Sequence, residues 1–244
     1  MAGMNTFRLT AGTEILTNNK INAMADKSDN QLVKAYDAMC EGNLKEAASL
    51  FEDVLVHDPA NIKVMLDLAG IYYVLCELSR SVKLYEKVLE LRPRSPYVMY
   101  RIGVALYRST RFTEAVTMFN KIIDSGKYLP MTYLWLGLAY YHLGKEEKSI
   151  ASYRKLIEYG PETMMGNYYM GIALKASGKY DEAIVFFDKL LNQTDHHVSA
   201  LYHLGRTHMK NFNFEKAKIY FKRAMELDPD NKNALEMYEY LLNI

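Results

Sequence analysis

Short helical stretches of about 13 residues follow one another in pairs along the chain, separated by turns that contain glycine or proline. One pair comprises residues 132–143 (TYLWLGLAYYHL) and 146–159 (EEKSIASYRKLIEY), on either side of the dipeptide GK. Gly144 and Gly178 are expected to end the first helix of their pairs, since glycine commonly follows a helix end. Proline near the end of a pair prevents the second helix from continuing. The pattern predicts helix hairpins and an all-α fold.

The hairpins repeat at an interval of 34 residues from residue 28 to residue 231, without an insertion. A first row of small residues contains Ala35, Ala69, Gly103, Gly137, Gly171 and Gly205. A second small row contains Ala47, Ser81, Ala115, Ser149, Ala183 and Ala217. An aromatic row contains Phe51, Tyr85, Phe119, Tyr153, Phe187 and Phe221. Proline occupies four of six places in a fourth row, at Pro59, Pro93, Pro161 and Pro229.

The small rows have a packing explanation, which Gly103 illustrates. Glycine inside a helix costs about 1 kcal/mol relative to alanine. Two antiparallel helices approach closely only where their side chains are small, so Gly103 is expected to face Ala115, with Phe119 beside them. Burial of a large apolar side chain, worth roughly 1.5–3 kcal/mol, offsets the glycine penalty.

These four rows resemble the pattern of the tetratricopeptide-repeat (TPR) family, which has small residues at the eighth and twentieth positions, an aromatic residue at the twenty-fourth and proline at the thirty-second. The resemblance implies a right-handed α-α superhelix whose first helices line a concave groove. It divides the chain into six repeats at 28–61, 62–95, 96–129, 130–163, 164–197 and 198–231.

Two terminal segments flank the predicted repeats. Residues 232–244 form an amphipathic helix with Leu235, Tyr238, Leu241 and Leu242 on one stripe, and Glu239 at the eighth position predicts a capping helix. Residues 1–27 are polar and lack clear periodicity, which predicts a tail or a loose extra helix; one alternative is that this tail docks into the groove of a neighbouring molecule.

In the family, the groove is lined by the second, fifth, sixth, ninth, twelfth and thirteenth positions of each repeat. Nine of the 20 tyrosines fall on these 36 positions, where an even spread would place about three. Tyrosine, tryptophan and arginine are common in binding hot spots, although tyrosine also serves packing in this family. The residues predicted to bind a partner are Tyr97, Tyr100, Arg101, Tyr107, Arg108, Trp135, Tyr141, His142, Tyr168, Tyr169, Lys175, Tyr202 and Arg206.

Arg101 and Arg108 lie within residues 91–113, which hold five arginines and no acidic residue. Their spacing of two helical turns places them on one helix face, where they could grip a carboxylate or phosphate, or simply pair with acids of the next repeat. The clamp by which some TPR co-chaperones bind a terminal carboxylate is matched only at Arg101. The predicted groove is therefore more apolar and suits a segment with aromatic anchors and an acidic group near Arg101.

The composition of the chain disfavours several classes of function and of site. Half of the residues are hydrophobic, 24% are charged and the net charge is +1, which disfavours nucleic-acid binding as the main role. Two cysteines, Cys40 and Cys76, favour reduced thiols over a disulfide framework or a zinc site. No signal peptide or membrane span is recognised, and the histidines near residue 200 are spaced poorly for a metal site.

We therefore predict a non-catalytic, cytoplasmic interaction module without a cofactor or metal, which binds a protein or peptide segment in its groove. The alternative is a scaffold that self-assembles around a larger complex or organelle surface, peripheral to a membrane, as magnetosome-associated TPR proteins do; this match is only at the level of the repeat.

Overall fold

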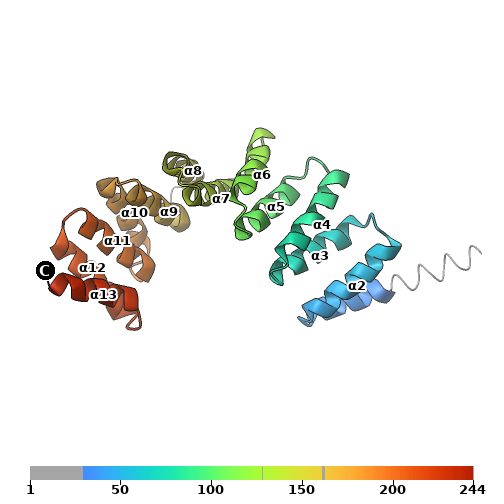
Figure 1. The fold of residues 1–244 in the computed structure, drawn as a ribbon, viewed down its shortest axis with the longest axis horizontal. Coiled ribbons are helices and arrows are strands. Elements are labelled where there is room, and N and C mark those ends of the chain that lie inside the picture. The colour runs from blue at the N-terminus through green and yellow to red at the C-terminus, as the bar shows by residue number, and fades with distance from the viewer. Residues whose placement is uncertain (1–29, 128, 161–162, 244) are drawn as a thin grey trace, which may run out of the picture. The chain divides into compact units, whose positions relative to one another are not determined.

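The computed structural model describes residues 30–127, 129–160 and 163–243, and every regular element in this part of the chain is a helix (Figure 1). Residues 30–40 are helical. The helices that follow are α2 (Leu44–His57), α3 (Ile62–Val74), α4 (Leu78–Leu91), α5 (Pro96–Arg108), α6 (Phe112–Asp124), α7 (Pro130–His142), α8 (Glu146–Tyr159), α9 (Met164–Ala176), α10 (Tyr180–Gln193), α11 (Val198–Lys210), α12 (Phe214–Leu227) and α13 (Lys232–Leu242). The predicted all-α fold is confirmed, while the prediction for residues 1–27 lies outside the described residues.

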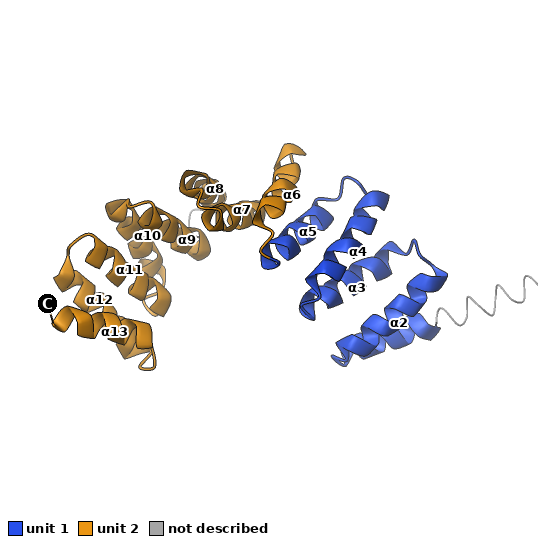
Figure 2. Ribbon diagram, viewed as in Figure 1, with its two compact units in different colours: residues 1–109 blue, residues 110–244 orange. Residues whose placement is uncertain are grey.

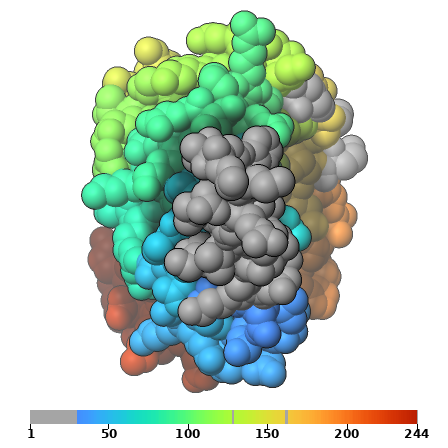
Figure 3. All heavy atoms as spheres, turned by 90° about the vertical axis from the view of Figure 1, so that its right-hand side faces the viewer, coloured from blue at the N-terminus to red at the C-terminus, as the bar shows by residue number. Residues whose placement is uncertain are grey.

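The helices alternate between the first and the second place in successive hairpins. We call the first helices and the terminal helix the A helices, namely α3, α5, α7, α9, α11 and α13. We call the second helices the B helices, namely α2, α4, α6, α8, α10 and α12. The chain divides into two compact units. Unit 1 comprises residues 1–109 and unit 2 residues 110–244 (Figure 2). The blue to green residues of unit 1 face the viewer in Figure 3.

Within each unit, each helix from α2 onward packs against the helices that follow and precede it in the chain. In unit 1, α3 packs against α4 within a hairpin and α4 packs against α5 of the next. Unit 2 repeats this arrangement, and there the A helices also contact one another, α7 with α9 and α9 with α11. The A helices α7, α9 and α11 of unit 2 therefore lie side by side.

Close contact within a hairpin occurs where the sequence predicts it. The buried Ser81 hydroxyl donates a hydrogen bond to the backbone oxygen of Ala69 at 2.8 Å, and Ser149 does the same to Gly137 at 2.8 Å. These bonds join the twentieth to the eighth position of a repeat. The pairing of Gly103 with Ala115 spans the two units and stays a prediction.

In unit 2, an aromatic ring from the B helix covers the glycine at the eighth position of the repeat. A Cβ atom added to Gly137 would overlap the Tyr153 ring, and one added to Gly171 would lie 2.8 Å from the Phe187 ring. Both rings are fully buried. The glycines of this row therefore make room for rings that cannot move aside.

The turn after an A helix uses one backbone geometry in every repeat. Gly144 and Gly178 have positive φ, as expected for residues that end a helix. After α7, the Gly144 amide bonds to the Tyr141 oxygen and the Lys145 amide to the Tyr140 oxygen, which together make a Schellman motif. The same position carries positive φ at Gly42, Cys76, Thr110 and Phe212. Three repeats thus hold a residue with a side chain where glycine is preferred.

Helix α13 packs against α12, but its apolar stripe differs from the one predicted. Ala234 and Leu241 are buried and Tyr238 contacts the core around Phe221. Leu235 and Leu242 instead point to solvent, with 38% and 59% of their surface exposed. Of the four residues predicted to lie on one apolar stripe, Tyr238 and Leu241 contact the core. Leu235 and Leu242 do not, because they lie one residue beyond Ala234 and Leu241 and are turned past the contact line.

We predict that Gly137→Ala lowers the free energy of unfolding by about 1–3 kcal/mol, because its Cβ would overlap the buried Tyr153 ring. The matched control is Gly70→Ala in α3, where the nearest atom would be the Tyr85 hydroxyl oxygen at 4.0 Å. This control should be neutral or stabilise by up to about 1 kcal/mol, as helix propensity dictates. Thermal and urea unfolding followed by circular dichroism measures both; equal effects would contradict the packing argument.

We also predict that Phe212→Gly raises the free energy of unfolding by about 1 kcal/mol, since Phe212 has φ +59° and an L-residue pays for that conformation. Little packing is lost, because 82% of the Phe212 surface is exposed. Gly178→Ala at the equivalent turn should lower stability by a similar amount. A destabilised Phe212→Gly protein in the same unfolding assay would show that its ring contributes more than its backbone costs.

Candidate functional site

The predicted binding residues lie on A helices. Five of them belong to α5 in unit 1, and eight belong to α7, α9 and α11 in unit 2. Tyr97 and Tyr141 are exposed over 55% and 36% of their surface, and Arg108 and His142 are also exposed. The partly buried members are Tyr100, Arg101, Tyr107, Trp135, Tyr168, Tyr169, Lys175, Tyr202 and Arg206. We call the surface that these side chains form on each unit its A face.

In unit 1, the Arg101 and Arg108 side chains both lie against one aromatic ring. Their guanidinium carbons lie 5.1 Å and 4.5 Å from the centre of the Tyr73 ring. Arg101 also donates a hydrogen bond to the Tyr85 hydroxyl at 3.0 Å, and Arg108 contacts the Cys76 sulfur at 3.5 Å. Aromatic groups, rather than the acids of a neighbouring repeat, therefore hold this pair.

On α7, the exposed end of the A face is aromatic. The His142 ring stacks on Phe112 with centroids 4.7 Å apart, and Tyr141 meets His142 edge to face at 5.8 Å. Trp135 lies half-buried nearer the start of the same helix. These rings offer flat apolar contact area with polar edges, which suits recognition of a partner's side chains.

The A face of unit 2 also brings three basic side chains together. Lys175 lies in the last turn of α9, and its ammonium nitrogen lies 2.9 Å from Nδ1 of His203 on α11. Arg206 follows His203 by three residues on α11, hence on the same face. We call Lys175, His203 and Arg206 the basic cluster. Within the described residues, no acidic side chain forms an ion pair with any of them.

Aromatic rings surround the basic cluster. The centre of the His203 ring lies 5.8 Å from the centre of the Tyr168 ring and 5.5 Å from the centre of the Tyr202 ring. The buried Phe187 ring stacks against His203 at 6.2 Å, and the Arg206 guanidinium lies 5.9 Å from the Tyr202 ring. Positive charge is thus held over an apolar aromatic base, where a bound anion would be screened less than in open water.

Burial and mutual repulsion set the protonation of the cluster. Burial, reinforced by the charge of Arg206, lowers the pKa of Lys175 to about 8. Burial first, and then the charges of Lys175, Arg206 and His197, lower the pKa of His203 to about 4. At pH 7 the cluster therefore contains two cations and a neutral imidazole that accepts a hydrogen bond from Lys175. An incoming carboxylate would supply the counter-charge that no acidic side chain among the described residues supplies.

Sequence reasoning selected Lys175 and Arg206 separately but did not select His203 or recognise the three as a group. The sequence signal that could have revealed this group is the position of its residues in the repeats. Lys175 holds the twelfth position of one repeat and His203 the sixth position of the next, and the structure places these two positions side by side. His208 lies elsewhere, buried and stacked on Tyr220. In the part of the chain that the structure describes, no three His, Cys, Asp or Glu side chains are placed to hold a metal ion.

Comparison with known families is consistent with this architecture. Family models described as tetratricopeptide repeat match residues 77–130, 100–162, 167–193 and 198–231, which together make up more than half of the chain. The chain belongs to the tetratricopeptide-repeat family. A TPR fold is a scaffold for protein–protein interaction, whereas the predicted repeat boundaries and site residues stay proposals. No curated protein matches this TPR sequence.

Several solved TPR structures share the fold. YrrB, described as a TPR protein with an unusual peptide-binding site, is 23% identical, with a TM-score of 0.66 over 79% of this chain and 99% of its own. PilW, described as a type IV pilus biogenesis factor, is 19% identical, with a TM-score of 0.72 over 86% of this chain and 97% of its own. MamA MSR-1 is 21% identical, with a TM-score of 0.60 over 69% and 97% of the two chains. Among the described helices of this TPR protein, none has the length and apolar character that crossing a bilayer requires.

The depressed pKa of His203 makes stability depend on pH in a defined direction. In the unfolded chain this imidazole titrates near its ordinary pKa of 6.5, whereas in the folded chain it stays neutral down to about pH 4. Between these values the unfolded state binds more protons, so the contribution of His203 to stability is present above pH 6.5 and is lost as the pH falls toward 4.

We predict that the imidazole carbons of His203 titrate near pH 4 in NMR spectra, and that Lys175→Met raises this pKa by removing a neighbouring positive charge. Lys179→Met, at an exposed position beyond the same helix, should leave the His203 titration unchanged. A midpoint close to 6.5 in the wild type, or the same midpoint in all three proteins, would contradict the proposed coupling within the cluster.

Proposed function

We propose that the protein is a non-catalytic interaction module whose A face binds a segment of a partner protein. In unit 2, the basic cluster accepts a carboxylate of that segment, and the neighbouring rings of Tyr168 and Tyr202 accept its apolar side chains. The observation that carries the proposal is the meeting of Lys175, His203 and Arg206 on α9 and α11 without an acidic partner among the described residues.

The chemistry of these groups supports a carboxylate as the ligand. A planar guanidinium accommodates a carboxylate with two parallel hydrogen bonds, and an ammonium group beside it adds a third donor. Hydrogen bonds that involve charged groups contribute about 1.5–3 kcal/mol each. YrrB, a protein of the same fold, has a peptide-binding site, which favours a peptide over a small molecule.

Unit 1 carries a second candidate binding surface, on its own A face. Tyr97 and Arg108 are exposed on α5, and Arg101 and Tyr100 lie beside them on the same helix. Both arginines already contact the Tyr73 ring, so they would favour aromatic and apolar side chains as much as acids. We therefore propose that the acidic group of the partner segment, which the sequence led us to expect near Arg101, binds at the basic cluster instead.

The proposal also includes the location, the cofactor requirement and the class of ligand that the sequence leads us to expect. The module acts in the cytoplasm, needs no cofactor or metal, and recognises protein segments instead of nucleic acid. Near-neutral net charge supports the last point, since nucleic-acid binding modules carry a marked excess of basic residues.

To test the proposal, we would select peptides from a random display library with the 244-residue chain. We predict that the selected peptides carry a carboxylate, from a side chain or the carboxyl terminus, next to an aromatic or aliphatic residue. Lys175→Gln/Arg206→Gln should raise the dissociation constant for the best synthetic peptide at least tenfold, the equivalent of about 1.4 kcal/mol. Because the carboxylate raises the pKa of Lys175, binding at pH 8 should also take up protons, measured by calorimetry in buffers with different ionisation enthalpies.

The matched control is Arg154→Gln/Lys155→Gln, which removes the same two types of charge from exposed positions on the B helix α8. This control should bind the peptide as the wild type does. Selected peptides without carboxylates would contradict the proposal, as would equal weakening by the two double variants.

A further inference from the structure

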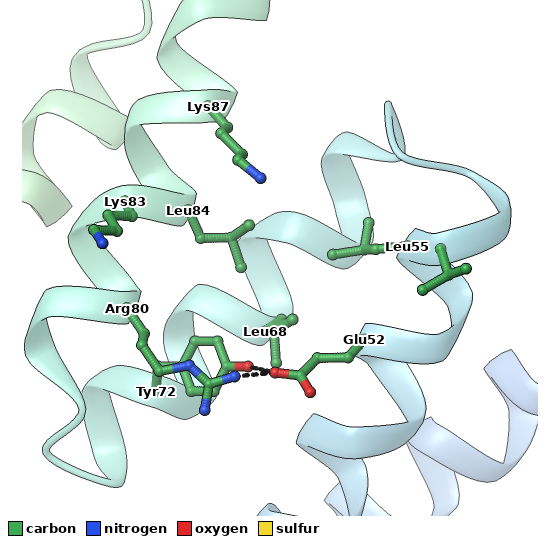
Figure 4. Close-up of a pocket in the computed structure, with 9 residues that line it drawn as sticks. Glu52, Leu55, Leu68, Tyr72, Arg80, Lys83, Leu84 and Lys87 are labelled. Atoms are coloured by element: carbon green, nitrogen blue, oxygen red, sulfur yellow. Dashed lines mark hydrogen bonds and ion pairs between the residues drawn. The ribbon is translucent and has the colours of Figure 1, made fainter.

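A pocket of about 360 Å³ lies between the B helices α2 and α4 of unit 1, and none of the predicted partner-binding residues lines it (Figure 4). Its floor is apolar: Leu55 comes from α2, Leu68 from α3 and Leu84 from α4. The repeat pattern does not predict this pocket, because the B helices enter that pattern only through their packing positions.

Charges at one end of the pocket are already satisfied. Glu52 accepts hydrogen bonds from the Tyr72 hydroxyl and from Arg80, as Figure 4 shows. Arg80 also pairs with Glu77 at 2.7 Å, and its guanidinium carbon lies 4.0 Å from the centre of the Tyr72 ring. This end of the pocket is therefore a closed network that offers no spare charge to a ligand.

The α4 edge of the pocket differs, because Lys83 and Lys87 form no ion pair within the described residues. They are four residues apart, one helical turn, and Figure 4 shows Lys87 extending toward the apolar floor. An apolar floor beside two lysines suits a helix face that combines leucines with carboxylates.

Helix α13 of the same chain presents such a face. Leu235, Glu239 and Leu242 follow the i, i+4, i+7 spacing of one stripe, and Glu236 lies next to it. All four side chains are exposed, since α13 packs against α12 through Ala234 and Leu241 on its other side. Neither glutamate forms an ion pair in the described part of the chain.

We infer that α13 of one molecule docks into the α2–α4 pocket of a second molecule. Leu235 and Leu242 would cover the leucines of the floor, while Glu236 and Glu239 face Lys83 and Lys87. The contact joins two different surfaces, so each molecule keeps one surface free for the next copy, and assembly proceeds head to tail until it closes into a ring or extends. This self-association is independent of the peptide binding proposed for the A face.

Light scattering and sedimentation of the 244-residue chain over a concentration series test this inference. We expect the mass of the wild type to rise above the 28.2 kDa monomer as the concentration increases. Lys83→Glu/Lys87→Glu and Glu236→Lys/Glu239→Lys should each remain monomeric, because like charges then face each other at the contact. An equimolar mixture of these two variants, or all four substitutions in one chain, should associate again.

The rescue by mixing shows that both variants are folded, since an unfolded chain could not restore the contact. Lys218→Glu/Lys222→Glu is the matched control, with the same spacing and charge change on α12, and it should associate as the wild type does. A monomeric wild type at every concentration overturns the inference. So does association that survives both charge reversals but is lost on removing residues 1–27, which would identify that segment as the occupant of the pocket.

Discussion

The close approach of the two helices in each hairpin is the constraint on which the other features depend. Hydrogen bonds from Ser81 to Ala69 and from Ser149 to Gly137 cross this contact, and fully buried rings such as Tyr153 close over it. A helix pair held so tightly buries one side only, and the next hairpin buries the other. Stability therefore propagates from neighbour to neighbour, as in other repeat proteins. Each unit is left with two open surfaces, one on its A helices and one on its B helices.

This constraint explains why the fold could be predicted from the sequence and much of the site could not. The small and aromatic rows recur at a fixed interval because the same contact is made in every repeat, so a single sequence reveals them. The contact between Lys175 and His203 is different, since it joins different repeats and occurs once. Its distance depends on how far one repeat is rotated against the next, which no residue pattern specifies. Arg101 and Arg108 were placed on one face correctly, but their preference for the Tyr73 ring over an acid depends on the same rotation.

The two groups of basic residues on the A faces consequently differ in what they offer a ligand. Arg101 and Arg108 rest on an aromatic ring, which already stabilises their charge. Lys175 and Arg206 repel each other in a partly buried place, and this repulsion contributes to the depressed pKa of Lys175. A carboxylate offsets that repulsion and stabilises the charged form of the lysine. The cluster in unit 2 would therefore bind this anion more strongly than the number of hydrogen bonds between them suggests. In the free protein, the unrelieved repulsion between Lys175 and Arg206 lowers stability slightly.

The two open surfaces carry different chemistry because the hairpin contact leaves their residues unconstrained. A-face positions hold tyrosines and paired cations around His203, whereas the B-face pocket combines a leucine floor with Lys83 and Lys87. Substitution at either surface leaves the eighth, twentieth and twenty-fourth positions intact, so binding properties can change without loss of the fold. For the same reason, membership of the family identifies the architecture and the general role in protein interaction, while the choice of partner must come from side chains that the repeat pattern does not fix.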